Sequence, residues 1–319
     1  MHPLSPPGPR AADLGVVIVS WHAASFLPAC LRSVYEQAGG IDLAVVVVCN
    51  SEDGSVELVE RDFPRARALR CENRGFAHAN NHGLLALDAR HVLLLNPDTE
   101  IQEGTLGDLV RLLDARPELG LVGVKQRTPE GELYPTIRRF PTVLRTLAAS
   151  LGYERWPVRP SFLGERELDL RLYEREVECD WTTGAFMLAR GSAIRAVGLL
   201  DERFFLYSEE PDLCLRLKAA GWEIRHVPLV TIVHHAGRGG ADPRLAAQDA
   251  YSRIQLARKH YSPARTLGIR CALGLGYLLR WGLGSGARRQ AARAALRVVA
   301  GLDGAPFGAR GGAVAPGAP

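Results

Sequence analysis

Asp98 lies just beyond a short apolar run, in a position that suits metal chemistry. The run Val92–Leu95 predicts a buried strand, and Pro97 after Asn96 cannot continue a central ladder. In open α/β sheets, ligands bind beyond the carboxyl ends of the strands. A carboxylate held there suits a hard cation, and a hard cation suits a diphosphate. The alternative is that Asp98 caps a helix that begins near Glu103, and this segment alone leaves both explanations open.

A second acidic group lies in the segment 204–222, whose sequence is FFLYSEEPDLCLRLKAAGW. Pro211 fits the first turn of a helix, where its missing N–H costs nothing. Glu209, Glu210 and Asp212 would then lie at the N-terminus of that helix, where carboxylates complement the helix dipole. Capping of the helix is one explanation for them. The other is that one carboxylate is a general base and a second carboxylate orients it.

Two further segments place polar groups after expected strands. His234 follows an apolar strand and could complete a metal shell or bind phosphate, although a single histidine is more often structural. The segment 73–83, NRGFAHANNHG, stands at a strand-to-helix junction, where backbone N–H groups can approach an anion. An ordinary turn before a weak helix is the alternative there.

Strands and helices alternate over the first 125 residues. The hydrophobic pattern predicts strands at 15–20, 43–49, 66–71, 92–95 and 119–125, and helices at 25–37, 54–63, 76–88 and 103–115. Strands that are apolar throughout are covered on both faces, so we expect an α/β fold with a mostly parallel central sheet flanked by helices. The motif GxGxxG follows none of these strands, which disfavours a dinucleotide-dependent dehydrogenase.

The pattern changes after residue 125. Residues 126–180 carry five prolines without clear periodicity and predict a mobile loop region near a substrate. Short strands are expected at 185–189, 223–226 and 229–234, and the chain is helical beyond Pro243. The predicted organisation is a disordered N-terminus at 1–12, an α/β domain at 13–245, a basic helical region at 246–302 and a disordered tail at 303–319.

The composition is that of an ordinary globular protein. The chain has 319 residues, of which 47% are hydrophobic and 23% are charged. Its six cysteines form no CxxC pair, which argues against a zinc site or a disulfide framework and fits a reducing cytoplasm. No apolar stretch reaches the ~20 residues of a membrane span. The N-terminus lacks the apolar core of a signal peptide, so we expect a cytoplasmic protein.

The net charge of +4 is unevenly distributed. Residues 251–302 contain ten Arg and Lys and no Asp or Glu, which leaves −6 for the rest of the chain. This basic region suggests an anionic membrane surface as a partner, with the protein peripheral on the inner face of the cell membrane. Packing of the helices on the α/β body is a second explanation, compatible with the first. Nucleic acid is disfavoured because no aromatic residues are interleaved to stack on bases.

In their order and spacing, these motifs resemble those of the family-2 glycosyltransferases of GT-A fold. The resemblance covers roughly residues 14–280 and is greatest for bacterial rhamnosyltransferase-like members that build cell-surface polysaccharides. It rests on VSWH at 19–22, VVVCNSEDGS at 46–55, ENRGFAHANNHG at 72–83, LLLNPDT at 93–99, TTGAFML at 182–188, the acidic segment at 204–222 and VHHAG at 233–237. It implies inverting transfer of a sugar, with rhamnose as a guess by similarity, from a nucleoside diphosphate sugar to a glycan or lipid-linked acceptor.

The resemblance also implies roles for single residues. Asp98 resembles the metal-binding acid of the family's DxD-type motif, with Asn96 in the position of the first acid, and His234 the histidine that assists the metal, Mg²⁺ or Mn²⁺. Glu210 resembles the base that deprotonates the acceptor hydroxyl, with Glu209 as the runner-up and Asp212 in support. The nucleotide-sugar pocket would contain Ser20, Trp21, Asn50, Asp53, Asn73, Gly75, Asn80, Asn96 and Gly184.

Three residues depart from the family pattern. Cys49 stands where an Asp usually contacts the base, His22 replaces an Asn, and Glu210 is one methylene longer than the usual Asp. These departures motivate a second hypothesis, in which the chain binds a nucleotide sugar or a glycan without transferring it.

Overall fold

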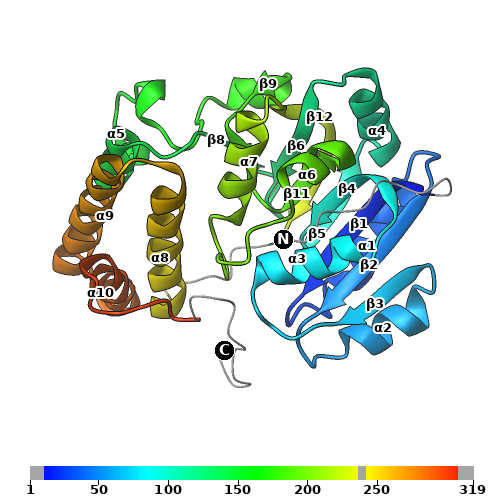
Figure 1. Ribbon diagram of the computed structural model, residues 1–319, viewed down its shortest axis with the longest axis horizontal. Coiled ribbons are helices and arrows are strands. Elements are labelled where there is room, and N and C mark those ends of the chain that lie inside the picture. Colours follow the sequence, from blue (N-terminus) through cyan, green and yellow to red (C-terminus); the bar gives the residue numbers. More distant parts are fainter. Residues whose placement is uncertain (1–10, 236–241, 308–319) are drawn as a thin grey trace.

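The computed structural model describes residues 11–235 and 242–307 as a mixed sheet with helices on both faces and a group of helices at one end (Figure 1). The main strands follow the order β3-β2-β1-β4-β11-β6-β12-β5. Their bounds are β1 Ala12–Ser20, β2 Leu43–Cys49, β3 Ala66–Arg70, β4 Ala89–Leu95, β5 Thr99–Glu103, β6 Leu119–Arg127, β11 Phe186–Arg190 and β12 Glu223–His234. Four short strands are β7 Leu133–Tyr134, β8 Ile137–Arg138, β9 Val177–Glu178 and β10 Trp181–Thr182.

Parallel pairing dominates one half of the sheet. β1 is parallel to β2 and β4, and β2 is parallel to β3. In the other half β6 and β12 are parallel, whereas β11 runs antiparallel between β4 and β6, and β5 is antiparallel to β12. The predicted mostly parallel α/β sheet is confirmed, with reversed strands that an apolar run cannot reveal.

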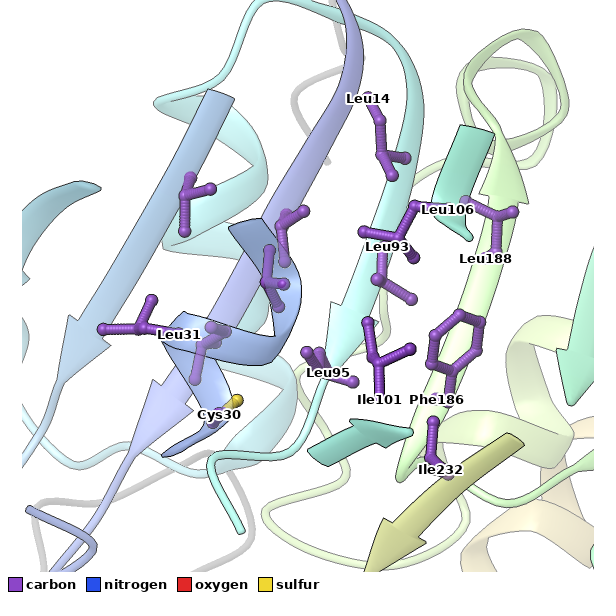
Figure 2. Close-up of a cluster of buried hydrophobic side chains, with 14 of the residues drawn as sticks. Leu14, Cys30, Leu31, Leu93, Leu95, Ile101, Leu106, Phe186, Leu188 and Ile232 are labelled. Carbon is purple, nitrogen blue, oxygen red and sulfur yellow. The ribbon is translucent and has the colours of Figure 1, made fainter. Parts of the chain in front are cut away.

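Alternate residues of the central strands pack into two separate hydrophobic cores, one on each face of the sheet. Val16 and Ile18 of β1 pack with the helices of one face, and Val17 packs with those of the other. Figure 2 shows the first core, which includes Leu31 of α1 and Leu93 of β4. The helices of this face are α1 Leu27–Glu36, α2 Ser55–Asp62 and α4 Leu106–Ala115; those of the other are α3 Phe76–Leu85, α6 Gly191–Val197 and α7 Glu209–Ala219.

Two expectations about the strands are wrong. Glu103 ends β5 instead of beginning a helix, and its carboxylate accepts a hydrogen bond from the Thr231 hydroxyl across the strand pair at 2.8 Å. The segments 223–226 and 229–234 form one strand, β12, because its register shifts between His226 and Thr231 and so absorbs Pro228. A bulge of this kind tolerates a residue that lacks an N–H.

The stretch 126–180 is built of short elements and is not the structureless loop that its prolines suggest. It contains helix α5 (Val143–Ser150) and the one-turn 3-10 helices at 153–155, 161–163 and 170–174. The Tyr173 side chain is fully buried, and its hydroxyl accepts a hydrogen bond from the Ile137 N–H at 3.1 Å. Elements this short lack the length over which periodicity can be recognised.

The chain is helical beyond Pro243, as its pattern predicts. Helices α8 (Pro243–His260), α9 (Pro263–Leu283) and α10 (Gly286–Ala300) pack around a third core that includes Ile254 and Leu273. Figure 1 shows them on the side of α7 that faces away from the sheet. Within the described part of the chain, no helix is both long and apolar enough to cross a membrane.

The ends of the chain, which the sequence predicts to be disordered, lie partly outside the described residues. The structure does not describe residues 1–10 and 308–319 of these ends, nor Ala236-Gly237 of the VHHAG motif. Ala12 already belongs to β1, and the Phe307 ring stacks on Phe205 with a centroid separation of 5.0 Å, so structure extends further at both ends than expected.

Candidate active site

Asp98 lies in the turn between β4 and β5 and does not cap a helix. Helix α4 begins after Thr105, whose side chain accepts a hydrogen bond from the Asp108 N–H at 3.2 Å. The explanation of Asp98 as a helix cap is therefore wrong. Its side chain keeps 21% of its surface exposed at the edge of the sheet.

The pairing of β5 with β12 brings His234 to Asp98. His234 lies opposite Thr99 in this antiparallel pair. Its Nε2 is 3.1 Å from Asp98 Oδ1 and 3.3 Å from Asn96 Nδ2. The side chains of Asp98, Asn96 and His234, which come from separate segments of the chain, thus lie together in space.

Gln126 and Thr183 connect this group to the acidic helix, and sequence reasoning gave neither of them a role. Gln126 is buried at the end of β6, and its side-chain amide lies 2.9 Å from His234 Nδ1. The Thr183 hydroxyl donates to Gln126 Oε1 at 3.5 Å. Gln126 follows the predicted strand 119–125 as Asp98 follows its own strand, and that shared position was the available signal.

Gly184 completes the connection to Glu210. Its N–H donates to Glu210 Oε1 at 3.2 Å. A Cβ at position 184 would lie 2.6 Å from the same oxygen, so glycine is required for this approach. A continuous series of polar contacts therefore runs from Asp98 through His234, Gln126 and Thr183 to Glu210.

Backbone strain precedes the acidic helix. Tyr207 and Ser208 adopt left-handed conformations, with φ of 66° and 72°. Non-glycine residues rarely adopt this region, and such strain persists where the surrounding structure imposes it. It turns the chain sharply into α7, so that the first residues of the helix, Glu209 and Glu210, face the end of the sheet.

The two glutamates have different surroundings. Glu209 is 2% exposed, and its Oε2 has no hydrogen-bond partner among the described residues. Burial and then the charge of Glu210 raise the pKa of Glu209 well above that of an ordinary glutamic acid. Burial also raises the pKa of Glu210, against backbone N–H donors that include Gly184 and against the charge of Arg138. Glu210 is the more accessible of the two.

Asp212 is an anchor between α7 and α8. It is fully buried and accepts hydrogen bonds from Arg216 Nε at 2.9 Å and His260 Nε2 at 2.7 Å, and Lys259 Nζ lies 2.5 Å away. Burial alone would raise its pKa, but His260, Arg216 and Lys259 together lower the pKa of Asp212 to about 2. These contacts leave Asp212 to position the helix that carries Glu209 and Glu210.

The loops after β1 and β2 form one side of the expected nucleotide pocket. Trp21 is 44% exposed, and the buried Oδ1 of Asn50 has no partner within the described ranges, so both can meet a ligand. Asp53 accepts hydrogen bonds from the Ala24 and Ser55 N–H groups. Burial would raise the pKa of Asp53, but hydrogen bonds from Ser55 and Ala24 lower it, so a carboxylate is held at this loop.

Other predicted pocket residues act through the backbone. Asn73 Oδ1 accepts from the Gly75 N–H at 3.3 Å, and Asn80 is 1% exposed and donates to the Phe76 carbonyl. Gly75 has a φ of 106°, and a Cβ there would overlap the backbone of Phe205. These residues shape the β3–α3 turn and hold it against the segment that leads into the acidic helix.

Two residues of the first loops are buried. The Ser20 hydroxyl lies 2.9 Å from the Ser55 hydroxyl and is inaccessible. Cys49 is a core residue, and burial raises the pKa of its thiol to about 12. The thiol is therefore neutral, and its packing accounts for an apolar side chain where the family pattern has an acid.

The metal group fits Mg²⁺ or Mn²⁺ better than a cation that needs a full protein shell. No group of three His, Cys, Asp or Glu side chains that could hold a metal occurs in the described part of the chain. Asp98, His234 and the Asn96 amide supply a hard oxygen and an imidazole nitrogen at one place. A Mg²⁺-like ion takes one or two carboxylates and fills its remaining positions with water and substrate phosphates.

The sheet, the acidic turn and the helix that faces it define a GT-A glycosyltransferase. Residues 9–258 match the family described as Glycosyltransferase like family 2, and the chain belongs to this family. The resemblance inferred from the motifs is confirmed.

The similar proteins include two rhamnosyltransferases. N-acetylglucosaminyl-diphospho-decaprenol L-rhamnosyltransferase of Mycobacterium tuberculosis is 34% identical over 226 residues, which cover 66% of this chain and 73% of that protein. Rhamnosyltransferase WbbL of Escherichia coli K12 is 27% identical over 171 residues, or 51% of this chain and 61% of that protein.

A solved structure supports the fold. The mannosyltransferase PcManGT of Pyrobaculum calidifontis, in complex with GDP-Man and Mn²⁺, aligns with a TM-score of 0.52 and 18% identity. The alignment covers 95% of this chain and 79% of that one. At this identity the likeness concerns the fold.

Replacing Asp212 with Asn should destabilise the protein by about 3 kcal/mol at pH 7, because it leaves the cations of Arg216 and Lys259 without their buried partner. The pKa of Asp212 is lowered in the folded state, so its contribution is present above the unfolded-state pKa of about 3.9 and disappears as the pH falls toward 2. Urea unfolding of wild type and D212N at several pH values measures the difference.

The matched control is E178Q, which removes an exposed partner of Lys218 and should cost less than about 1 kcal/mol. Equal unfolding midpoints for wild type and D212N at pH 7 would contradict the anchoring role of Asp212.

Proposed function

We propose that the protein is a metal-dependent, inverting glycosyltransferase that moves a sugar from a nucleoside diphosphate sugar to a glycan or lipid-linked acceptor in cell-surface polysaccharide synthesis. Family membership supplies the reaction class. The observation that carries the proposal is the series of contacts that joins Asp98 and His234 to Glu210 through Gln126, Thr183 and Gly184. It brings a site for the donor diphosphate and a candidate base to the same end of the sheet.

Asp98 and His234, with the Asn96 amide, would hold Mg²⁺ or Mn²⁺. When bound, such an ion neutralises the charge that develops on the leaving nucleoside diphosphate. Gln126 fixes the ring of His234 from the opposite nitrogen, with its amide nitrogen 2.9 Å from Nδ1. Asn50 Oδ1, Asp53 and the ring of Trp21 offer polar and stacking contacts to the nucleoside.

Glu210 would take the proton from the acceptor hydroxyl. As the new bond forms between that oxygen and the anomeric carbon, the bond from this carbon to the diphosphate oxygen breaks, and its electron pair leaves with the nucleoside diphosphate. Attack from the face opposite the leaving group inverts the configuration in one step. Gly184 lies beside the Glu210 carboxylate, and a side chain there would press against it.

The donor sugar and the acceptor are proposed from the relatives. Both similar proteins named above are rhamnosyltransferases, and one name contains a decaprenol-linked diphosphate acceptor. We therefore propose a rhamnose donor and a lipid-linked acceptor. The second hypothesis, binding without transfer, loses much of its motivation, because Cys49 packs in the core and the longer Glu210 side chain reaches Gly184.

We also propose that α9 contacts an anionic membrane surface. Leu267, Leu275, Leu278 and Trp281 are exposed at helical spacing along α9, and the exposed Arg288, Arg289 and Arg293 follow on α10. Folding neutralises part of the basic region, since Arg253 pairs with Glu165 and Lys259 with Asp201 and Asp212. The remaining charge and the apolar stripe match an interfacial helix.

Asp98→Ala should lower the transfer rate by about 100-fold or more, because the cation that neutralises the donor diphosphate loses its carboxylate ligand. EDTA should abolish transfer by the wild type, and Mg²⁺ or Mn²⁺ should restore it. Transfer from a panel of nucleoside diphosphate sugars measures this, with E103A, at the far end of β5, as the control. Undiminished turnover in EDTA would remove the metal from the mechanism.

Glu210→Gln should lower kcat by about 100-fold to 10,000-fold and leave the Kd of the donor unchanged, because only the proton acceptor is lost. Glu209→Gln should have a small effect, since burial raises the pKa of Glu209 and so favours its neutral form, which Gln resembles. The reverse pattern would make Glu209 the base.

The wild-type profile of kcat/KM against pH should fall on the acid side with a midpoint above the ordinary glutamic acid value of 4.5, because burial raises the pKa of Glu210 and the base must be ionised. Initial rates across a pH series measure it. A midpoint at or below 4.5 would contradict this assignment.

Replacing Leu267, Leu275 and Leu278 together with Ser should weaken binding to phosphatidylglycerol vesicles at least about tenfold at low salt, because apolar area buried in the interface drives binding. Vesicle sedimentation measures it, and circular dichroism checks that the helices persist. L302S, which changes an exposed leucine outside α9, is the control. Unchanged binding of the triple variant would leave α9 with a structural role.

A further inference from the structure

A cavity of about 880 Å³ lies beside the candidate active site, between α5 and the C-terminal helices. Arg138 of β8 is one of the lining residues, and Figure 1 shows β8 between α5 and α7. Two glutamates and six arginines line the cavity; the arginines are Arg138, Arg155, Arg166, Arg253, Arg280 and Arg288. The cavity therefore carries an excess of positive charge.

Part of that charge is uncompensated. Arg253 is neutralised by Glu165, with Nη2 and Oε2 2.5 Å apart. Arg166 approaches Glu154 at 3.5 Å, and the Glu154 side chain is 53% exposed, so this pair is weak. The buried Nε atoms of Arg138 and Arg166 have no hydrogen-bond partner in the part of the chain that the structure describes. Two neighbouring guanidinium groups with unused donors match an anion with several oxygens.

Arg138 links the cavity to the candidate base. It lies opposite Trp181 in the β8–β10 pair, and Thr183 and Gly184 follow Trp181 directly along the chain. Its charge also lowers the pKa of Glu210, which places the two side chains within electrostatic reach. A ligand whose anionic group binds Arg138 and Arg166 can therefore extend a neighbouring sugar toward Glu210.

Most of the other lining residues are apolar. Leu151 and Leu283, 46% and 87% exposed, lie at the surface of the cavity, and Leu279 lines it. Leu283 ends α9, the helix whose exposed stripe faces outward. One cavity thus combines the half-buried Arg138 and Arg166 with leucines at the surface, and this matches an amphiphile with an anionic group and a hydrocarbon tail.

We propose that this cavity binds the diphosphate of a lipid-linked acceptor, an inference that rests on the proposed function. Arg138 and Arg166 hold the phosphate oxygens, and the hydrocarbon leaves over Leu151 and Leu283 toward the surface that carries α9. The acceptor sugar, attached to the same diphosphate, then lies at Glu210. The site is separate from the donor diphosphate site at Asp98 and requires no metal.

Farnesyl diphosphate, an amphiphile with the same groups and no sugar, is a suitable probe. Calorimetry with the full chain in EDTA excludes binding that depends on a cation at Asp98. Arg166→Gln should weaken binding of farnesyl diphosphate about 10-fold to 100-fold, because a charge-assisted contact is lost. Leu283→Ser should weaken farnesyl diphosphate severalfold and leave inorganic diphosphate unchanged. Arg67→Gln, an exposed arginine of β3 far from the cavity, should change neither.

The transfer assay separates this inference from the proposed function. With a polyprenyl-diphosphate-linked sugar as acceptor, R166Q should raise the KM of the acceptor and leave the KM of the donor unchanged, and R166K should recover only part of the loss. If the wild type is active and R166Q has the same acceptor KM as R67Q, the cavity proposal is overturned and the proposed transferase function stands. If the wild type is inactive but still binds farnesyl diphosphate through Arg166, the proposed transferase function is overturned and the anion site in the cavity stands.

The lipid source is tested in the same way. Phosphatidylglycerol vesicles carry a phosphate and hydrocarbon but no diphosphate, and they should not displace farnesyl diphosphate from the wild type. Displacement at matched phosphate concentration would overturn the proposal in favour of a membrane headgroup site.

Discussion

The antiparallel pairing of β5 with β12 is the constraint on which the candidate active site depends. Asp98 leaves the sheet at the end of β4, near the middle, whereas β5 pairs at the far edge. Because His234 lies opposite Thr99 in that edge pair, it returns to the turn that holds Asp98. A slip of one residue would turn His234 to the other face and separate the two side chains.

The position of α7, which carries Glu209 and Glu210, depends on a second constraint, the buried contacts of Asp212. Two buried glutamates at one helix end repel each other, and the left-handed Tyr207 and Ser208 add strain. Such costs persist only where other contacts offset them. Asp212 supplies those contacts, since Arg216, Lys259 and His260 tie the first turn of α7 to its own second turn and to α8. The C-terminal helices are therefore part of what holds the candidate base in place.

The same helices give the protein a second kind of surface. In the proposed reaction the α/β sheet supplies the donor side, which short polar loops after parallel strands form in many nucleotide-binding proteins. Residues 126–180 and α8–α10 supply the arginines and leucines of the neighbouring cavity. The division fits a reaction between a water-soluble donor and an amphiphilic acceptor.

The sequence predicts best what local chemistry determines. Apolar runs and the proline after Asn96 locate β4 and its polar end, and Pro211 locates the start of α7. Gln126, β5 and the reversed direction of β11 depend on pairing between distant segments, which no local pattern encodes. The cavity arginines come from six separate elements or turns, so their convergence appears only in the folded chain.

Paramagnetic broadening by Mn²⁺ tests the central claim most directly. In a deuterated protein saturated with a nucleoside diphosphate, Mn²⁺ should broaden the amide signals of Asp98, Gly184 and His234 and leave that of Thr266, on α9, sharp. Broadening that spares Asp98 and His234, or that centres on another part of the molecule, would contradict a donor site at the junction of β4, β5 and β12.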